Sequence, residues 1–172
     1  MKTRKKVLAL SLVAALAVAA CSDDDKGSGG TGGTTGGTLV FGASADPVVL
    51  DGAYVSDGES MRVIYQIFET LVTTKPGGTE VQPLLAKSWS ASADGLEWTF
   101  KLQTGVKFHD GTDFNAAAVC FNFERWYNFA GVAQSASVSY YWSTVFGGFS
   151  DGATESLYKG CEATDDATAV IS

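Results

Sequence analysis

Histidine is almost absent from this chain of 172 residues, since His109 is its one representative. A zinc site built on several histidines is therefore excluded, and a Ser-His-Asp or Cys-His mechanism would rest on this one side chain. Basic residues are scarce as well, with 12 Lys and Arg against 19 Asp and Glu, which gives a net charge of −7. Because nucleic-acid binding depends on excess positive charge, we expect no nucleic-acid partner.

The chain also lacks a hydrophobic run long enough to cross a membrane, which takes about 20 apolar residues. Its longest run, residues 7–20, has 14 residues and follows the basic segment MKTRKK. This pattern predicts a secretory signal peptide at residues 1–20. The small residues before Cys21 resemble the lipobox of bacterial lipoproteins, so Cys21 would carry the lipid that holds an exported protein on the outer face of the cytoplasmic membrane. The alternative is an ordinary secretory signal in which Cys21 is incidental.

The next segment has no apolar side chain and contains seven glycines within residues 22–37. It cannot bury a core, so residues 21–37 are predicted to be a disordered linker that reaches about 20–25 Å on average. All the aromatic residues lie between Phe41 and Tyr158. Hydrophobic residues make up 45% of the chain, and the folded part is therefore expected over residues 38–172.

Hydrophobic periodicity predicts a mixed α/β or α+β fold for this part, and no internal repeat is present. Residues 44–58 read as a long structured loop because Pro and Asp-Gly punctuate them. The other expected elements are a buried strand at 39–41, a helix from about residue 61 to 72 capped by Ser56 or Asp57, two neighbouring strands at 98–102 and 106–108, a helix after Asn115, and a strand from residue 167.

His109 lies between the strand expected at residues 106–108 and an Asp-Gly turn. Together with Asp110 and Asp113 it could be read as a metal cluster, but H-D-x-x-D is not a spacing typical of any metal geometry. We interpret His109 as a turn residue. We therefore expect no catalytic residue, no metal site and no cofactor.

Two cysteines remain if Cys21 is lipidated. An exported protein folds in an oxidising compartment, so the even pair Cys120 and Cys161 favours a disulfide that closes a loop of about 40 residues. Two separate buried thiols are the alternative.

The segment 139–149 is rich in aromatic residues, among them Tyr140, Tyr141 and Trp142. Aromatic side chains of this density either line a ligand cleft or form the wall of a core. The sequence leaves both interpretations open.

Three consecutive segments form one long signature: LLAKSW at residues 84–89, SADGLEWTFKL at 92–102 and GVKFHDGT at 105–112. This signature resembles the family 5 extracellular solute-binding proteins, the peptide- and nickel-binding subunits of ABC transporters. Residues 120–127 and 161–163 look most like actinobacterial members. The resemblance implies apolar anchoring roles for Trp89, Trp98 and Phe100.

The resemblance also implies a fold and a function. The family fold has two α/β lobes joined by a hinge, and its members capture a peptide or similar solute outside the cytoplasmic membrane and deliver it to ABC permease and ATPase subunits. We therefore expect a transport protein rather than an enzyme, acting as a monomer. Among the residues present, Asp51, Tyr54 and Asp57 of one loop, together with the aromatic triplet 140–142, are the candidates for cleft lining.

The chain departs from the family mainly in length, since members are several times longer. Residues 38–172 would then be the N-terminal part of the solute-binding lobe, with the second lobe missing. Two further functions stay open: a lipid-anchored surface receptor that binds peptide signals without transport, and an exported hydrolase that uses His109.

Overall fold

The computed structural model describes residues 37–172, so the predicted signal peptide, Cys21 and nearly all of the predicted linker lie outside the described residues. The chain divides into two units, Met1–Phe41 and Gly42–Ser172. Within the described end of the first unit, residues 37–41 contain no helix or strand, and Leu39 is 90% exposed. The prediction of a buried strand at residues 39–41 is therefore wrong, because no strand among the described residues pairs with this short apolar run.

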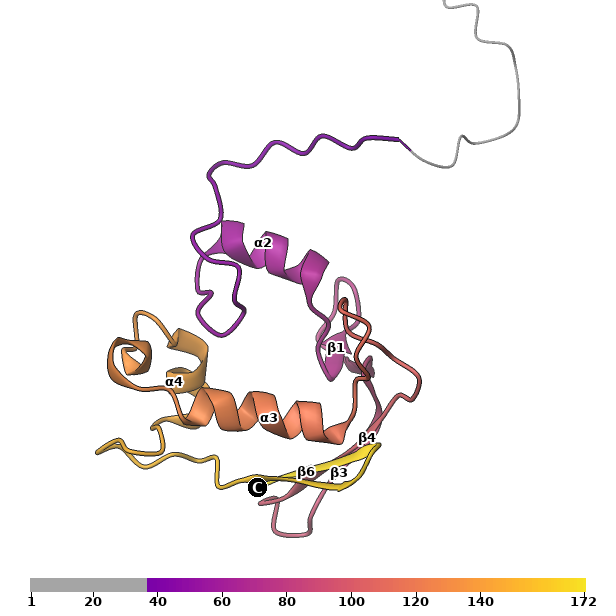
Figure 1. The fold of residues 1–172 in the computed structure, drawn as a ribbon, viewed down its shortest axis with the longest axis vertical. Helices are drawn as coiled ribbons and strands as arrows, with labels where there is room; N and C mark the ends of the chain where they lie inside the picture. Colours follow the sequence, from indigo (N-terminus) through magenta and orange to yellow (C-terminus); the bar gives the residue numbers. More distant parts are fainter. Residues whose placement is uncertain (1–36) are drawn as a thin grey trace, which may run out of the picture. The chain divides into compact units, whose positions relative to one another are not determined.

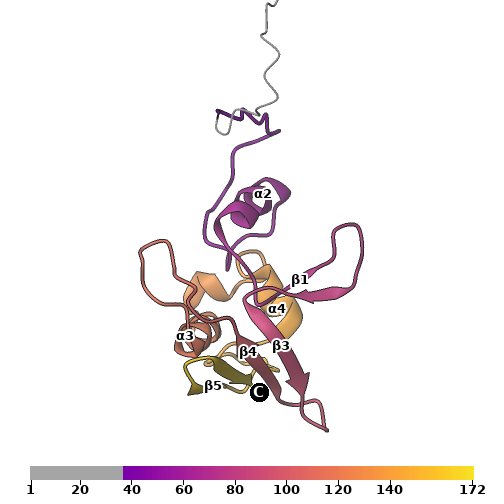
Figure 2. The ribbon, with the colours of Figure 1, turned by 90° about the vertical axis from the view of Figure 1, so that its right-hand side faces the viewer.

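The second unit is built around a four-stranded antiparallel sheet (Figure 1). Its strands are β3 (Ala86–Ala91), β4 (Trp98–Leu102), β5 (Cys161–Asp165) and β6 (Thr168–Ile171), in the order β3-β4-β6-β5. A separate two-stranded sheet pairs β1 (Val72–Thr74) with β2 (Val81–Pro83). Figures 1 and 2 show α3 (Ala116–Tyr127) crossing one face of the four-stranded sheet.

Alternation along the strands explains which face α3 covers. Phe100 stands opposite Trp89 on one side and Ala169 on the other, while the intervening Thr99 and Lys101 point to the opposite face. Between this face and α3 lies a core of buried residues. The sheet supplies Ala86, Leu102 and Ala169, and α3 supplies Ala116 and Val119. The opposite face is mainly polar, with Val170 beside Thr99, and there Lys101 Nζ donates to Thr168 Oγ1 over 2.9 Å. This division into an apolar and a polar face is what a half-buried antiparallel sheet requires.

The predicted strand at residues 98–102 is confirmed as β4, but its neighbours were not foreseen. β4 pairs with β3 and β6, not with residues 106–108. Residues 106–108 instead enter a tight turn, where the N–H of Phe108 donates to the carbonyl of Thr112 and the N–H of Gly111 donates to the carbonyl of Phe108. Only Lys107 makes a β-bridge there, to Asp113. The predicted strand at 106–108 is therefore wrong, because this local turn uses the backbone groups that a longer strand would need.

Both predicted helices are present, and both begin at a side-chain cap. Asn115 Oδ1 accepts from the N–H of Ala118 at the start of α3, and Asp57 Oδ1 accepts from the N–H of Ser60 at the start of α2 (Gly58–Ile67). The helix α2 ends five residues before residue 72, where we expected its end, because Val72 already lies in β1.

The buried face of α2 differs from the expected one. Ile64 is buried, but Tyr65 is 70% and Phe68 50% exposed. Ser60 takes the inner position instead, and its hydroxyl accepts from the N–H of Val48 over 2.8 Å. The helix therefore packs against the loop that precedes it, which the periodicity of apolar residues could not show.

A second core is aromatic. Phe129, Trp142, Phe149 and Tyr158 are buried in it, and it packs α4 (Tyr140–Phe146) beside α3. A short 3₁₀ helix, η1 (Gly131–Gln134), joins these two helices. Phe123 and Cys161 contact both cores. Among residues 37–172, no helix has the length and apolar character needed to cross a bilayer.

We expect acid to destabilise the fold through the aspartates of its caps and turns. Hydrogen bonds donated by Ser60 hold the pKa of Asp57 below its ordinary 3.8. Hydrogen bonds from Ser92 and Thr112 likewise lower the pKa values of Asp94 and Asp110. A carboxyl group whose pKa is lowered by folding stabilises the native state above its unfolded pKa, and this contribution is lost as the pH falls through the folded value.

Urea unfolding as a function of pH measures this effect. The free energy of unfolding should begin to fall when the pH drops below about 4. In Asp57→Asn the amide can still accept the capping hydrogen bond but does not titrate, so the fall should be shallower. An identical pH slope in parent and variant would contradict the role given to Asp57.

Candidate binding site

The loop 51–57 lies against α3 through Asp51, one of the predicted binding residues. Asp51 Oδ2 pairs with Arg125 Nη2 over 2.5 Å, and the other oxygen, Oδ1, accepts from the N–H of Ala53 over 3.0 Å. The N–H of Tyr54 also donates to the backbone carbonyl of Asp51, which closes the turn. Both carboxylate oxygens of Asp51 are therefore engaged within the protein.

Tyr54 stacks on Phe129, with ring centroids 5.0 Å apart and an interplanar angle of 25°. The Arg125 guanidinium lies near both rings, with its Cζ 5.3 Å from the Phe129 centroid and 6.0 Å from the Tyr54 centroid. Cation–π attraction adds to the ion pair at these distances. The sequence reasoning missed Arg125, since its partner Asp51 lies 74 residues away along the chain.

Asp57, the third predicted residue of this loop, is the N-cap of α2. Its Oδ1 accepts from the N–H of Ser60 over 2.8 Å, so one carboxylate oxygen is used to begin the helix. The sequence left Ser56 and Asp57 as alternative caps, and the structure shows that the cap is Asp57. Asp57 caps α2 whereas Asp51 pairs with Arg125 of α3, so the two aspartates serve different elements.

The aromatic triplet of α4 divides into an inner and an outer part. Trp142 is only 6% exposed, and its indole Nε1 donates to the carbonyl of Gly148 over 3.0 Å. Tyr140 and Tyr141 are about half exposed and contact each other edge to face, 5.2 Å apart. Tyr54 and Trp142 therefore pack on the same aromatic core, while the two tyrosines stand outside it.

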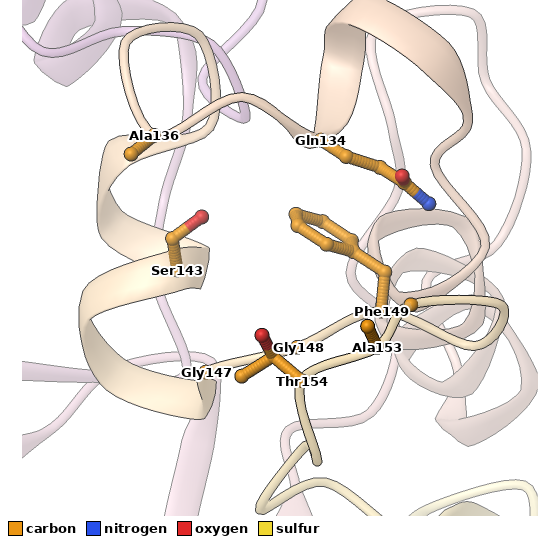
Figure 3. A pocket seen from close by; sticks show the side chains of 9 residues that line it. Gln134, Ala136, Ser143, Gly147, Gly148, Phe149, Ala153 and Thr154 are labelled. Carbon is orange, nitrogen blue, oxygen red and sulfur yellow. The ribbon is translucent and has the colours of Figure 1, made fainter.

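A cavity of about 310 Å³ lies between α4, η1 and the loop that follows α4 (Figure 3). Its walls include Gln134, Ser143 and Phe149, and Figure 3 shows the Ser143 hydroxyl and the Phe149 ring turned toward its interior. The Ser143 Oγ atom is buried and has no hydrogen-bond partner. The residues that line it carry no charged side chain. None of the six predicted binding residues lines it.

The floor of this cavity depends on two adjacent glycines. Gly147 has φ +81°, a conformation that side-chain-bearing residues rarely adopt. A Cβ on Gly148 would lie 1.7 Å from the backbone carbonyl oxygen of Thr154. The chain therefore approaches itself too closely at Gly148 for any other residue.

We expect Gly148→Ala to destabilise the protein by at least about 3 kcal/mol, because the overlap involves backbone that cannot rotate away. The matched control is Gly58→Ala, where a Cβ would meet nothing within 4 Å. Thermal unfolding followed by circular dichroism compares the two. Equal melting temperatures for parent and Gly148→Ala would show that the close approach at Thr154 does not exist in solution.

Cys120 of α3 and Cys161 of β5 are joined by a disulfide, with their Cα atoms 5.1 Å apart. It ties the helix to the edge strand of the sheet beneath it.

The Tyr158 hydroxyl donates to Glu124 Oε1 over 2.6 Å. Burial, followed by this hydrogen bond, raises the pKa of Tyr158 far above its ordinary 10.0, so the tyrosine stays protonated.

His109 lies exposed in the turn after Phe108. Its neighbour Asp110 accepts from both the N–H and the Oγ1 of Thr112, so this carboxylate closes the turn. Across residues 37–172, no cluster of three or more His, Cys, Asp or Glu side chains is arranged to hold a metal ion. The geometry around His109 is that of a turn.

Comparison with known proteins decides the family. Residues 80–172 match the family model described as bacterial extracellular solute-binding proteins, family 5 middle, which is more than half of the chain. This chain belongs to that family. The resemblance of the signature at residues 84–112 to family 5 is therefore confirmed.

Relatives and solved structures agree with this assignment. The chain is 45% identical over 91 residues to the probable D,D-dipeptide-binding periplasmic protein DdpA of Escherichia coli K12, covering 51% of this chain and 18% of the relative. It is 36% identical over 129 residues to heme-binding protein A of Haemophilus influenzae, covering 67% of this chain and 24% of the relative.

Among solved structures, the periplasmic binding protein DppA from Helicobacter pylori in complex with the peptide STSA is 33% identical, with a TM-score of 0.55. That match covers 74% of this chain and 25% of the solved one. The mixed α/β fold of this chain is thus that of part of a family 5 binding protein. The chain spans about a quarter or less of the length of these proteins.

Proposed function

We propose that this protein captures peptides, or similar small solutes, outside the cytoplasmic membrane and delivers them to an ABC importer. The observation that carries the proposal is membership of family 5 across residues 80–172, a family of extracellular solute-binding proteins. Several similar proteins are named for dipeptides or di- and tripeptides. Others are named for heme or were solved with an iron or nickel chelate, so peptide is the leading class of solute and not the sole one.

The proposal also includes a lipid anchor on Cys21. The basic start, the apolar run of residues 7–20 and the small residues before Cys21 support it. A lipid there, followed by the glycine-rich segment 22–37, would hold the folded part on the outer face of the cytoplasmic membrane, beside a permease. The partners would be the permease and ATPase subunits, with the protein acting as a monomer and without a cofactor.

Cell fractionation tests the anchor. The parent should be recovered with the membrane fraction, and Cys21→Ala should not acquire lipid and should lose that association. Gly58→Ala, where a Cβ would meet nothing within 4 Å, is the control and should remain membrane-bound. Equal membrane recovery of parent and Cys21→Ala would overturn lipidation at this position.

Isothermal titration calorimetry of the purified protein tests solute capture. Trialanine is the first probe, with free alanine as the negative control and nickel–histidine and heme as the alternatives. Saturable heat with trialanine and none with alanine would support peptide capture. Saturable binding of a metal chelate alone would replace peptide by that solute class, and hydrolysis of the peptide during the titration would favour the exported hydrolase.

A further inference from the structure

The segment before α2 has no helix or strand of its own, yet several side-chain contacts hold it in place. Residues 42–57 contain no regular element. At one point the buried Ser60 hydroxyl accepts from the N–H groups of Val48 and Val49, over 2.8 and 3.4 Å. These bonds fix the segment to the start of α2, but they do not reach the loop 51–57.

The loop itself is fixed to α3 by Arg125. The ion pair with Asp51 joins residues that are 74 positions apart, and each side chain is still about one third exposed, 37% for Asp51 and 35% for Arg125. An exposed ion pair alone contributes little because solvent screens it. Here the same guanidinium also lies against the Phe129 and Tyr54 rings, so one side chain holds both the carboxylate and the aromatic ring of the loop.

Asp51 has the geometry of a residue that shapes a loop. Its Oδ1 is bonded to the N–H of Ala53 within its own turn, and its Oδ2 is bonded to Arg125. A solute that needed this carboxylate would have to break one of these two interactions. The loop conformation therefore depends on Asp51, whether or not a solute approaches.

We propose that Arg125 is a positioning residue for the loop 51–57 and influences solute binding through that loop, without touching the solute itself. The proposal rests on the proposed function for its effect on affinity. It reassigns Asp51 from a solute contact to the partner of Arg125, and it leaves Tyr54 as the side chain whose place the pair secures. The loop should then open when either member of the pair is removed.

Hydrogen–deuterium exchange without any solute measures the opening directly. In Arg125→Met, the amides of Ala53 and Tyr54, both bonded to Asp51 in the native turn, should exchange about 10-fold faster. Asp51→Asn keeps the side-chain shape and should have the same effect, so a folding defect of one variant does not decide the result. Arg125→Lys retains the charge and should restore most of the protection.

The matched control removes an ion pair elsewhere. Lys159 pairs with Glu155 over 2.7 Å, and Lys159→Met should leave exchange in the loop unchanged. Trialanine affinity is the second readout, expected to weaken about 10-fold in Arg125→Met and Asp51→Asn and to recover in Arg125→Lys.

The two readouts separate the two proposals. Unchanged exchange at Ala53 and Tyr54 in both variants would overturn the positioning role, whatever the parent binds. A parent that binds no peptide would overturn the proposed function, and with it the effect on affinity, while the exchange data would still establish how the loop is held. Faster exchange with unaltered trialanine affinity would show that the loop has no part in solute binding.

Discussion

Replacing Trp142 with alanine should destabilise the protein by about 3–5 kcal/mol, the cost of truncating a large buried aromatic side chain. Trp142 is 6% exposed and packs against the rings of Phe146, Phe149 and Tyr158. Its truncation leaves a cavity in the aromatic core and also removes the donor to the carbonyl of Gly148. Urea unfolding at neutral pH, followed by circular dichroism, gives the change in free energy.

Two further variants separate core packing from solute contact. Trp142→Phe retains a ring in the core and should lose clearly less stability than Trp142→Ala. Tyr141→Ala, on the same helix but 47% exposed, should lose less than about 1 kcal/mol. If Trp142→Ala unfolded like the parent but no longer bound trialanine, Trp142 would belong to the solute site and the core assignment would be wrong.

Removing the disulfide should have a comparably large effect. Cys120 and Cys161 are separated by 41 residues, and closing a loop of this size stabilises the native state by about 4 kcal/mol on the chain-entropy model. The bond also holds β5, an edge strand, against α3. The double variant Cys120→Ala/Cys161→Ala should therefore unfold at much lower urea concentration than the oxidised parent.

Reduction of the parent provides the matched comparison. Dithiothreitol should lower the stability of the parent toward that of the double variant and should leave the double variant unchanged. A thiol assay on the unreduced, denatured parent should detect neither Cys120 nor Cys161. Two reactive thiols in that assay would contradict the disulfide.

Local sequence signals predicted the elements whose determinants lie close together in the chain. The Asn115 cap and the apolar spacing after it predicted α3, and strict alternation predicted β4 at its observed bounds. The strand expected from residue 167 is β6. In each case the residues that decide the structure fall within one or two turns or one strand length.

The missed strands β3 and β5 lie next to their partners along the chain, since β3 pairs with the following β4 and β5 with the following β6. They were missed because they contain few large apolar residues, so hydrophobic alternation is weak in both. The pairing of β4 with β6, in contrast, joins segments far apart in the chain. The opposite error occurred at residues 106–108, where apolar alternation is present but the backbone is used in a turn. A single sequence does not reveal which segments meet.

The candidate site shows the same limit. Sequence reasoning named Asp51 and Tyr54 but could not supply Arg125, which contacts both of them from α3, 74 positions beyond Asp51 along the chain. Sequence reasoning also could not find the cavity beside α4. The feature that marks the cavity is the buried Ser143 hydroxyl without a hydrogen-bond partner, and burial is visible only in the structure. The identity of the family, in contrast, was carried by the contiguous signature at residues 84–112.

Uptake of radiolabelled trialanine by intact cells tests the central claim most directly, because it measures delivery as well as capture. Cells in which the gene is disrupted should accumulate markedly less label than the parent strain, and the intact gene supplied in trans should restore uptake. Equal uptake with and without the gene, while the purified protein still binds the peptide, would contradict a role in import and would favour a surface receptor.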